Sequence, residues 1–404
     1  MDEKEEQFDI AVVGGGPAGL SAAYSAAKGG AKVVLFEKDQ SIAHSIRTSG
    51  VTWISEMERL GVPSKFYNPI KNYRFVSPSN DVLITGDVSK LCVLDIRATY
   101  QHLSVLAAKE GAQLKVKSNV IDVIKDGYRV VGVKASTPEG MLTVHSTLVI
   151  DASGFSTSIG RKAGMASNWK RYGVGAEYEC YCDDIDSITW VLMVGQKYSN
   201  AGYAWVFPIS PNRVRIGVGI GRPESNTDPL EKLHKIIEKR FKPLDAIGHG
   251  KIQPLELHYG FIPNQGVRRN SIGDGLIMVG DSAGQSNPLV LEGIRYAIDF
   301  GRLAGKVGAD SLSRNSDKES LMEYEQSWKA KVESKIQSAL KVQTRWLGLT
   351  DEEWDKEIEI LRDMTVQEFL DFIKADFTKV NMMKLAVHHP KIAARQLFNM
   401  ILKS

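Results

Sequence analysis

The sequence is poor in cysteine and has no long apolar segment, and these two absences narrow the class of protein. Its 404 residues include three cysteines, Cys92, Cys180 and Cys182, which are too few for a disulfide framework and lack the paired spacing of a zinc site. No apolar run reaches the roughly 20 residues that a membrane-spanning helix requires. The acidic start, residues 1–7, lacks the basic and apolar regions of a secretory signal. We therefore expect a cytoplasmic protein without a metal, whose contact with a membrane, if it makes one, is peripheral.

A large excess of charge of one sign is also lacking. The sequence has 51 Lys and Arg against 48 Asp and Glu, and its basic residues are scattered, so we expect no nucleic-acid partner. A hydrophobic content of 43% with 36 glycines is typical of a folded enzyme. The length exceeds that of one ordinary domain, and we expect two or three structural units.

The first forty residues have the pattern of a β-α-β unit. An apolar run over 8–13 predicts a strand, 18–27 predicts a helix, and 32–36 predicts a second strand, parallel to the first. Short strands separated by Gly, Asn and Pro over 166–267 predict an antiparallel sheet instead, and the segment after 316 is helical and charged. We expect a discontinuous Rossmann-type α/β domain of 1–65, 92–165 and 268–315, an inserted antiparallel-sheet substrate domain of 66–91 and 166–267, and a C-terminal helical domain of 316–404.

A glycine-rich motif, Gly14-Gly-Gly-Pro-Ala-Gly19, lies between the first predicted strand and helix. Such a turn brings the backbone close to a pyrophosphate, whose charge is stabilised by the helix N-terminus. Glu37, followed by Lys38, ends the second strand at the spacing where an acidic side chain accepts hydrogen bonds from ribose hydroxyls. The motif therefore predicts dinucleotide binding by Gly14, Gly15, Gly16, Pro17, Ala18, Gly19, Glu37 and Lys38. Tight packing and a solvated strand-end charge are the alternatives that require no ligand.

Two later segments favour FAD over NAD by resemblance. Asp151-Ala-Ser-Gly154 resembles the DGxxS-type segment of the hydroxylase-like FAD superfamily, and Gly280-Asp281-Ser-Ala-Gly284, followed by Glu292-Gly293-Ile294, resembles its second FAD motif. The resemblance implies that Asp281 contacts the ribityl chain and that a helix points at the flavin. It also implies that Arg97 lies near the FAD phosphates and Val120 near the adenine, although a helix arginine and a strand valine are ordinary without a ligand.

The segment Gly202-Tyr-Ala-Trp-Val-Phe-Pro208 resembles the YxWxFP segment of geranylgeranyl reductases. In a strand, Tyr203, Trp205 and Phe207 point to one face and would form an apolar wall, which with Pro288 is our expected substrate pocket. A packed core sheet is the alternative. The resemblance covers residues 8–310 and implies an FAD-dependent reductase that saturates carbon–carbon double bonds of a prenyl lipid, or acts on another apolar small molecule. The electron donor, NAD(P)H or a ferredoxin-like protein, is not identified by any motif.

The sequence departs from this family at two positions. Asn200 replaces a proline, and Thr48, in Ser45-Ile-Arg-Thr-Ser-Gly50, stands where many archaeal reductases have a cysteine beside the flavin. A thiol cannot act there, and a hydroxyl is a far weaker acid. We expect Arg47, Thr48 and Ser49 at the flavin, and a proton from water held near Thr48 or from Tyr203. The candidate catalytic residues are Thr48, Tyr203 and Trp205.

Other functions share the same FAD motifs. A monooxygenase or halogenase is one, although the lysine that halogenases carry in a glycine-rich loop is not found. Electron transfer to a quinone is another, but three scattered cysteines cannot bind the iron–sulfur cluster common in such proteins. After Pro390, apolar residues recur at near-helical spacing with basic residues between them, which predicts either an interfacial membrane helix or a packed terminal helix.

Overall fold

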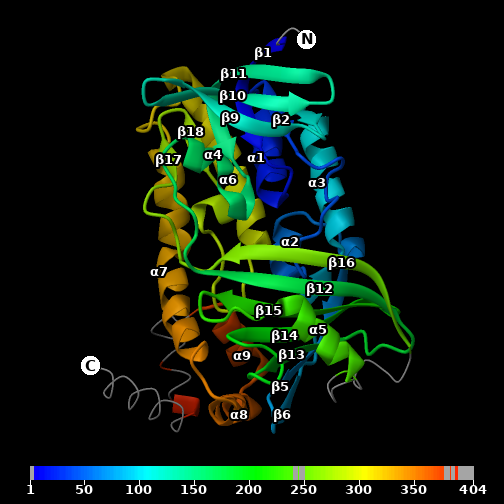
Figure 1. Cartoon of the computed structure of the whole chain (residues 1–404). Coiled ribbons are helices and arrows are strands. Elements are labelled where there is room, and N and C mark those ends of the chain that lie inside the picture. The colour runs from blue at the N-terminus through cyan, green and yellow to red at the C-terminus, as the bar shows by residue number, and fades with distance from the viewer. Residues whose placement is uncertain (1–3, 240–243, 245–250, 377–382, 384–386, 390–404) are drawn as a thin grey trace. The chain divides into compact units, whose positions relative to one another are not determined.

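The computed structural model describes residues 4–239, 244, 251–376, 383 and 387–389. The chain divides into two compact units, each made of three separate segments. Figure 1 colours the chain by residue number, so the segments can be located by colour. The first unit comprises residues 1–67, 94–173 and 258–334, and the second comprises 68–93, 174–257 and 335–404. The residues expected to form a separate helical domain, 316–404, are divided between these two units within helix α7 (Met322–Trp346).

The first unit is organised around a parallel sheet. Five strands run parallel in the order β8-β2-β1-β11-β18, namely β8 (Gln113–Lys115), β2 (Val33–Phe36), β1 (Lys4–Val13), β11 (Gly140–Asp151) and β18 (Leu276–Met278). Three antiparallel strands complete it, β9 (Asn119–Asp126), β10 (Arg129–Thr137) and β17 (Ile272–Gly273). All four residues of β2 are buried, as expected for a sheet covered on both faces. The predicted Rossmann-type α/β fold is thereby confirmed.

Helix α1 (Pro17–Lys28) packs against two other helices of this unit, α3 (Ile96–Lys109) and α6 (Ile294–Ser311), all labelled in Figure 1. The backbones of α1 and α6 approach closely at two glycines of α6. A Cβ atom at Gly301 would lie 2.4 Å from the carbonyl oxygen of Ala18, and one at Gly305 would lie 2.1 Å from that of Ala22. The shorter helices α2 (Ile54–Arg59) and α4 (Ser158–Lys162), with the first half of α7, belong to the same unit.

The second unit contains a seven-stranded sheet in the order β16-β12-β15-β14-β13-β5-β6. Its strands are β5 (Asn72–Val76), β6 (Asp81–Thr85), β12 (Tyr172–Cys182), β13 (Thr189–Val194), β14 (Gly202–Ser210), β15 (Arg213–Arg222) and β16 (Ile252–Pro263). The first two residues of β12 and residues 258–263 of β16 are counted with the first unit. The pairs β13–β14, β14–β15 and β5–β6 are antiparallel, as predicted. However, β5 pairs with β13 in parallel, so the sheet is not antiparallel throughout. No tight turn joins these two strands, and their direction is therefore not set by a hairpin.

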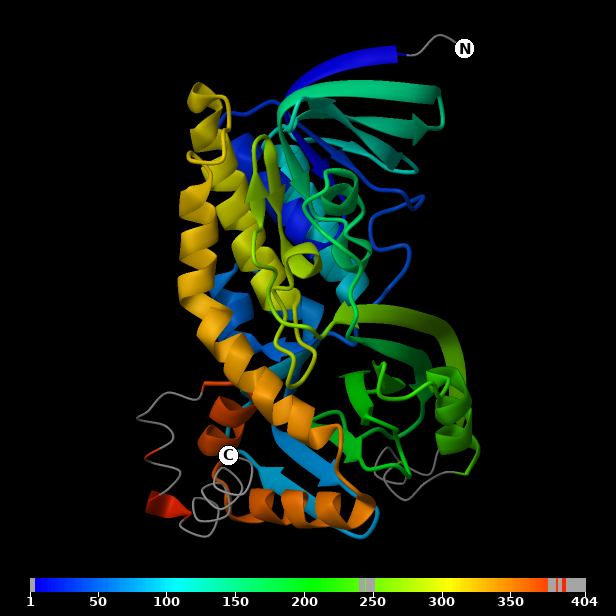
Figure 2. The same cartoon turned by 60° about the vertical axis from the view of Figure 1, so that its left-hand side comes forward.

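One face of this sheet is covered by α5 (Pro229–Glu238), drawn in light green in Figure 2. Leu233 and Ile236 of α5 pack on alternate residues of the strands, including Ile216 and Val218 of β15. Because side chains alternate along a strand, the residues between them point to the opposite face. That opposite face carries the aromatic residues described below.

The C-terminal helices of this unit are α8 (Asp351–Glu359) and α9 (Val366–Ile373), with a 3₁₀ turn between them (Ile360–Asp363). Figure 2 shows α8, in orange, beside the blue β5–β6 hairpin. Asp355 of α8 accepts hydrogen bonds from the hydroxyl of Ser77 and from the amide of Ser79, at 2.9 Å for the amide. The hairpin turn is thus attached to a helix that is distant in sequence, since Ser77 and Asp355 are 278 positions apart. Among the described residues, three further strands form a separate small sheet: β3 (Val51–Trp53), which belongs to the first unit, and β4 (Tyr67–Ile70) and β7 (Leu91–Leu94), which lie mostly in the second.

Candidate FAD site and aromatic sheet face

The glycine motif forms the turn between β1 and α1. A Cβ atom at Gly14 would lie 2.2 Å from the carbonyl oxygen of Ala152, and one at Gly19 would lie 1.9 Å from that of Gly14, so neither position admits a side chain. By contrast, a Cβ atom at Gly16 would meet nothing within 4 Å. Gly16 precedes α1 without a side-chain cap, and Pro17 occupies the first turn. Amides at an uncapped helix N-terminus beside open space suit a pyrophosphate.

Glu37 follows β2 and is tied to the same turn. Its carboxylate accepts hydrogen bonds from the amide of Gly15, at 2.7 Å, and from the amide of Asp39, at 2.8 Å. These bonds fix the carboxylate beside the glycine turn, and its expected contact with a ribose stays a prediction. Lys38 beside it is exposed.

Two aspartates lie at the ends of neighbouring strands: Asp151 is the last residue of β11, and Asp281 lies in the turn that follows β18. Asp151 is fully buried and accepts hydrogen bonds from the amides of Ser153 and Gly160, at 2.9 and 2.7 Å. Burial raises the pKa of Asp151, although these bonds act in the opposite direction. Asp281 lies in the 3₁₀ turn η4 (Gly280–Ala283), and burial raises its pKa to about 6. Asp151 therefore stabilises its own loop through these two hydrogen bonds. The pKa of Asp281, by contrast, would change if a ligand bound to its carboxyl.

Asp281 lies next to the start of α6. Gly293 is the N-cap of that helix, Ile294 is its first residue, and a Cβ atom at Gly293 would lie 3.6 Å from a carboxylate oxygen of Asp281. Pro288 is buried in the loop between η4 and α6. Gly154 adopts a positive φ of 67° in the loop after Asp151.

The segment around Thr48 is held by polar contacts. Arg97 donates a hydrogen bond of 2.7 Å to the carbonyl oxygen of Ala43, and Arg47 pairs with Asp39 at 3.3 Å. Thr48 and Ser49 are half-buried in the loop before β3. Val120, by contrast, is 7% exposed and belongs to the apolar core around β1, β10 and β11. The flavin contacts of these residues stay predictions.

A buried arginine that the motifs did not indicate follows Ile294. Arg295 lies over the rings of Trp53 and Tyr296, at 4.6 and 4.0 Å from their centroids, and pairs with Glu292 at 2.8 Å. Stacking on two rings suits a guanidinium, which is weakly hydrated. Because Trp53 ends the strand after Thr48, this arginine joins the Thr48 segment to the start of α6.

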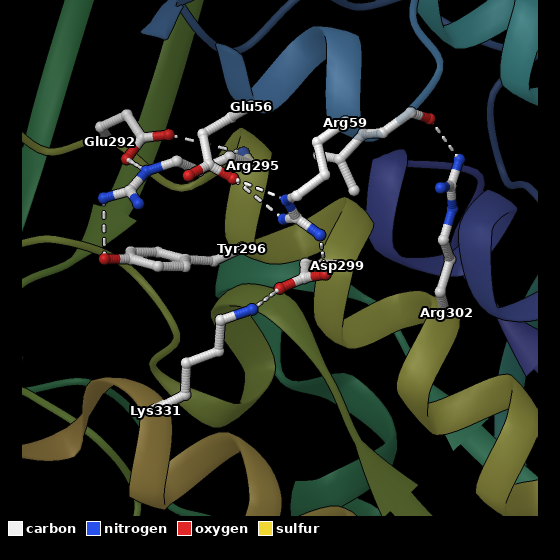
Figure 3. Close-up of polar contacts among 9 residues, drawn as sticks. Glu56, Arg59, Glu292, Arg295, Tyr296, Asp299, Arg302 and Lys331 are labelled. Carbon is white, nitrogen blue, oxygen red and sulfur yellow. Dashed lines mark hydrogen bonds and ion pairs between the residues drawn. The ribbon is translucent and has the colours of Figure 1, made fainter.

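Figure 3 shows how the network continues along α6. Arg59 of α2 pairs with Glu56 and with Asp299, at 2.9 and 3.0 Å, and Lys331 of α7 pairs with the same aspartate. Burial would raise the pKa of Asp299, but its bonds to Lys331 and Arg59 lower it overall. Arg302 donates to the carbonyl oxygen of Leu60 at 2.6 Å. Helix α2 is therefore fixed against α6 over about two turns, from Arg295 to Arg302.

The aromatic residues of β14 share one face of the second unit's sheet, as predicted. Tyr203 meets Trp205 edge-on at 5.8 Å, and Trp205 and Phe207 are stacked at 6.0 Å. Trp190 of β13 extends the row by stacking on Phe207 at 5.4 Å. Trp205 and Phe207 are 8% and 3% exposed, whereas Tyr203 is half-buried. Of the three predicted wall residues, Tyr203 retains the most accessible surface.

A charged cluster lies on the same face and was not anticipated. Glu177 and Glu179 of β12 and Arg215 of β15 are 3%, 4% and 1% exposed. Arg215 pairs with Glu179 at 3.3 Å and approaches Glu177 at 3.7 Å. The sequence does contain a pattern that indicates this cluster. Glu177 and Glu179 occupy alternate positions of β12, Arg213 and Arg215 occupy alternate positions of β15, and both strands are otherwise largely apolar.

Comparison with known proteins identifies the chain. Residues 9–258 match the FAD dependent oxidoreductase family. The chain is 31% identical to digeranylgeranylglycerophospholipid reductase of Methanocaldococcus jannaschii, over 94% of this chain and 97% of that protein. It is 30% identical to reductase 1 of that name from Methanococcoides burtonii, over 92% of each. The chain belongs to the digeranylgeranylglycerophospholipid reductase family of FAD-dependent oxidoreductases.

A solved structure agrees with this membership. A geranylgeranyl bacteriochlorophyll reductase-like protein from Thermoplasma acidophilum superposes with a TM-score of 0.85 at 26% identity, covering 97% of this chain and 98% of that one. A flavin-dependent brominase, with a TM-score of 0.69 at 19% identity, shares the fold. As a member of this reductase family, the protein is an FAD-dependent oxidoreductase, which confirms the predicted enzyme class and cofactor.

Proposed function

We propose that this enzyme saturates carbon–carbon double bonds of a prenyl lipid of the geranylgeranyl type. The observation that supports this most is the likeness to reductases of that name, which extends over more than nine-tenths of the chain and so includes both units. Flavin-dependent halogenation or oxygenation has weaker support, because the likeness to the brominase is one of fold alone.

Reduced FAD supplies a hydride equivalent to one alkene carbon when it is bound. The uncapped amides at the start of α1 would hold its pyrophosphate, Glu37 its ribose and Asp281 its ribityl chain. An isolated alkene is a poor hydride acceptor, so the protein has to position the lipid and exclude water.

The second alkene carbon requires a proton. Two sources are compatible with this chain: the hydroxyl of Tyr203, and a water bound near Thr48. Burial raises the pKa of Tyr203, so its hydroxyl stays protonated over the whole physiological range. A neutral hydroxyl is a weak acid, so it transfers its proton most readily once negative charge has developed on the second carbon.

The electrons and the lipid both come from outside the chain. We propose an external donor, NAD(P)H or a ferredoxin-like protein, and peripheral binding to the membrane in which a polyprenyl lipid resides. In the part of the chain that the structure describes, no helix is long and apolar enough to cross a membrane.

The decisive test is anaerobic reoxidation. The purified enzyme is reduced with dithionite and mixed, without oxygen, with a digeranylgeranylglycerophospholipid in detergent. We expect the oxidised flavin absorbance to return and the lipid to gain two hydrogen atoms for each bond reduced. Reoxidation by oxygen alone, with unchanged lipid, would contradict the proposal and favour an oxygenase.

A further inference from the structure

The indole of Trp205 is held in place from two directions within the second unit. Its Nε1–H donates a hydrogen bond of 2.6 Å to the carboxylate of Glu177, and both side chains are buried. Beneath the ring, β15 presents glycine: Trp205 and Gly217 are directly opposite in the antiparallel pair. A Cβ atom at Gly217 would lie 2.3 Å from the indole ring, so the ring lies flat against backbone.

Glu177 is itself held by charge. Arg215 lies between Glu177 and Glu179, and Arg213 pairs with Glu179 at 3.0 Å. A carboxylate in a buried site requires compensation, and this pair of arginines supplies it. The cluster places a guanidinium beside Glu177, and a carboxylate is a stronger hydrogen-bond acceptor for the indole N–H than a neutral group.

Trp205 is in contact with Tyr203 on one side and with Phe207 on the other. Tyr203 rests edge-on against the indole at 5.8 Å, while the far side of Trp205 is closed by the stacked Phe207. A tilt of the indole would therefore displace Tyr203, which has the most accessible surface of the three rings of β14. For proton transfer, an error of about 1 Å in position costs on the order of 100-fold in rate.

We propose that Glu177 is a positioning residue: acting through the indole N–H of Trp205, it sets the position of Tyr203 toward the reacting lipid. Gly217 supports the same placement by leaving room for the flat ring. This inference rests on the proposed reductase function and on Tyr203 facing the lipid. It assigns a role in the reaction to a buried ionic cluster that a purely structural account would treat as part of the fold.

The experiment is a double-mutant cycle on the holoenzyme. Glu177→Met keeps the size of the side chain but removes the acceptor, and Trp205→Phe keeps an aromatic ring but removes the donor. We expect Glu177→Met to lower kcat for the digeranylgeranyl lipid by 10-fold or more with a smaller change in KM. The same substitution should have little further effect in the Trp205→Phe background, since the interaction is already absent.

Two further variants separate positioning from folding. Glu177→Gln retains an acceptor oxygen and should restore most of the lost turnover. Glu179→Met removes the neighbouring carboxylate of the same cluster, and its effect should add to that of Trp205→Phe. Thermal melts and FAD absorbance of every variant show whether the fold is retained.

Hydrogen exchange of the Trp205 indole N–H tests the hydrogen bond without measuring turnover. In protein labelled with ¹⁵N at tryptophan, the Trp205 Nε1–H signal, assigned by its loss in Trp205→Phe, should exchange slowly with solvent and become fast in Glu177→Met. The positioning role is wrong if the wild type turns over lipid but the effects of Glu177→Met and Trp205→Phe on kcat simply add. It is also wrong if the exchange rate of the Trp205 Nε1–H is the same in Glu177→Met as in the wild type. If the wild type is not reoxidised by lipid although the N–H is protected, the proposed function fails and this role fails with it.

Discussion

Asp281 is a residue whose chemistry depends on where the fold puts it. Burial raises its pKa from an ordinary 3.8 to about 6. Because the folded state binds this proton more tightly than the unfolded state, the carboxyl contributes stability below pH 4 that is lost as the pH rises through 6. Two pKa units correspond to roughly 3 kcal/mol.

We therefore expect Asp281→Asn, in FAD-free protein, to become more stable than the wild type as the pH is raised. The difference in unfolding free energy between the two should change by roughly 2 to 3 kcal/mol between pH 4 and pH 7.5. Urea unfolding at both pH values measures it. A difference that is the same at both would show that the fold does not raise the pKa of this carboxyl.

Tyr203 and Thr48 compete for the role of proton donor, and single substitutions distinguish them. If the phenol supplies the proton, Tyr203→Phe should lower turnover by about 100-fold or more while FAD content and melting temperature stay close to wild type. The wild-type rate should also stay level up to pH 9, because burial raises the pKa of Tyr203. Thr48→Val is the matched variant, and a larger loss there would favour a water held at Thr48 instead.

At the scale of elements, the contact between α1 and α6 leaves no room for side chains at two positions of α6. It depends on Gly301 and Gly305, where any Cβ atom would collide with the backbone of α1. The N-terminus of α1 carries the glycine turn, so a shift of this helix would move the expected pyrophosphate site. The packing of Gly301 and Gly305 against α1 thus supports the position of the glycine turn that is expected to bind the pyrophosphate.

We expect Gly305→Ala to destabilise the protein by about 2 to 3 kcal/mol, because the helices have to separate to admit the methyl group. FAD affinity should fall with it. Lys306→Ala, at an exposed neighbour on the same helix, is the control and should change neither. Circular dichroism melts and titration with FAD give both quantities. An unchanged melting temperature in Gly305→Ala would contradict the close approach.

At the scale of the whole molecule, the question is which segment meets the lipid surface. The predicted interfacial helix, after Pro390, lies outside the described residues. The residues just before it are held by an acidic partner: His388 and His389 contact the carboxylate of Glu368 at 2.7 and 3.3 Å. Burial opposes ionisation of Glu368, but its bonds to His388, Thr365 and His389 lower its pKa to about 2.

Truncation after His389 leaves these contacts in place and removes only the predicted membrane segment. We expect the truncated protein to keep its flavin absorbance and melting temperature but to lose co-sedimentation with anionic vesicles. In the full-length protein that binding should weaken with salt, since each basic residue at the surface contributes on the order of 1 kcal/mol. Co-sedimentation that survives truncation would place the membrane contact elsewhere.

Local patterns in the sequence were sufficient to predict the Rossmann-type fold of the first unit. A strand, a glycine turn and a helix follow one another within thirty residues, and the steric demand for glycine at Gly14 and Gly19 arises within that one turn and the loop beside it. The periodicity of β14 likewise placed Tyr203, Trp205 and Phe207 on one face. Family membership, enzyme class and FAD followed from such motifs, because their residues lie close together in the chain.

What only the tertiary structure decided involves partners that are distant in sequence. The parallel pairing of β5 with β13 joins segments more than 100 residues apart, and no turn fixes their direction. The raised pKa of Asp281 comes from burial in the folded chain, which the sequence of the motif does not show. The bond from Trp205 to Glu177 crosses the sheet between strands that are not adjacent. Hydrophobic periodicity indicates which face a side chain occupies, but its partner on that face is set by strand order and register, and those exist only once the sheet has formed.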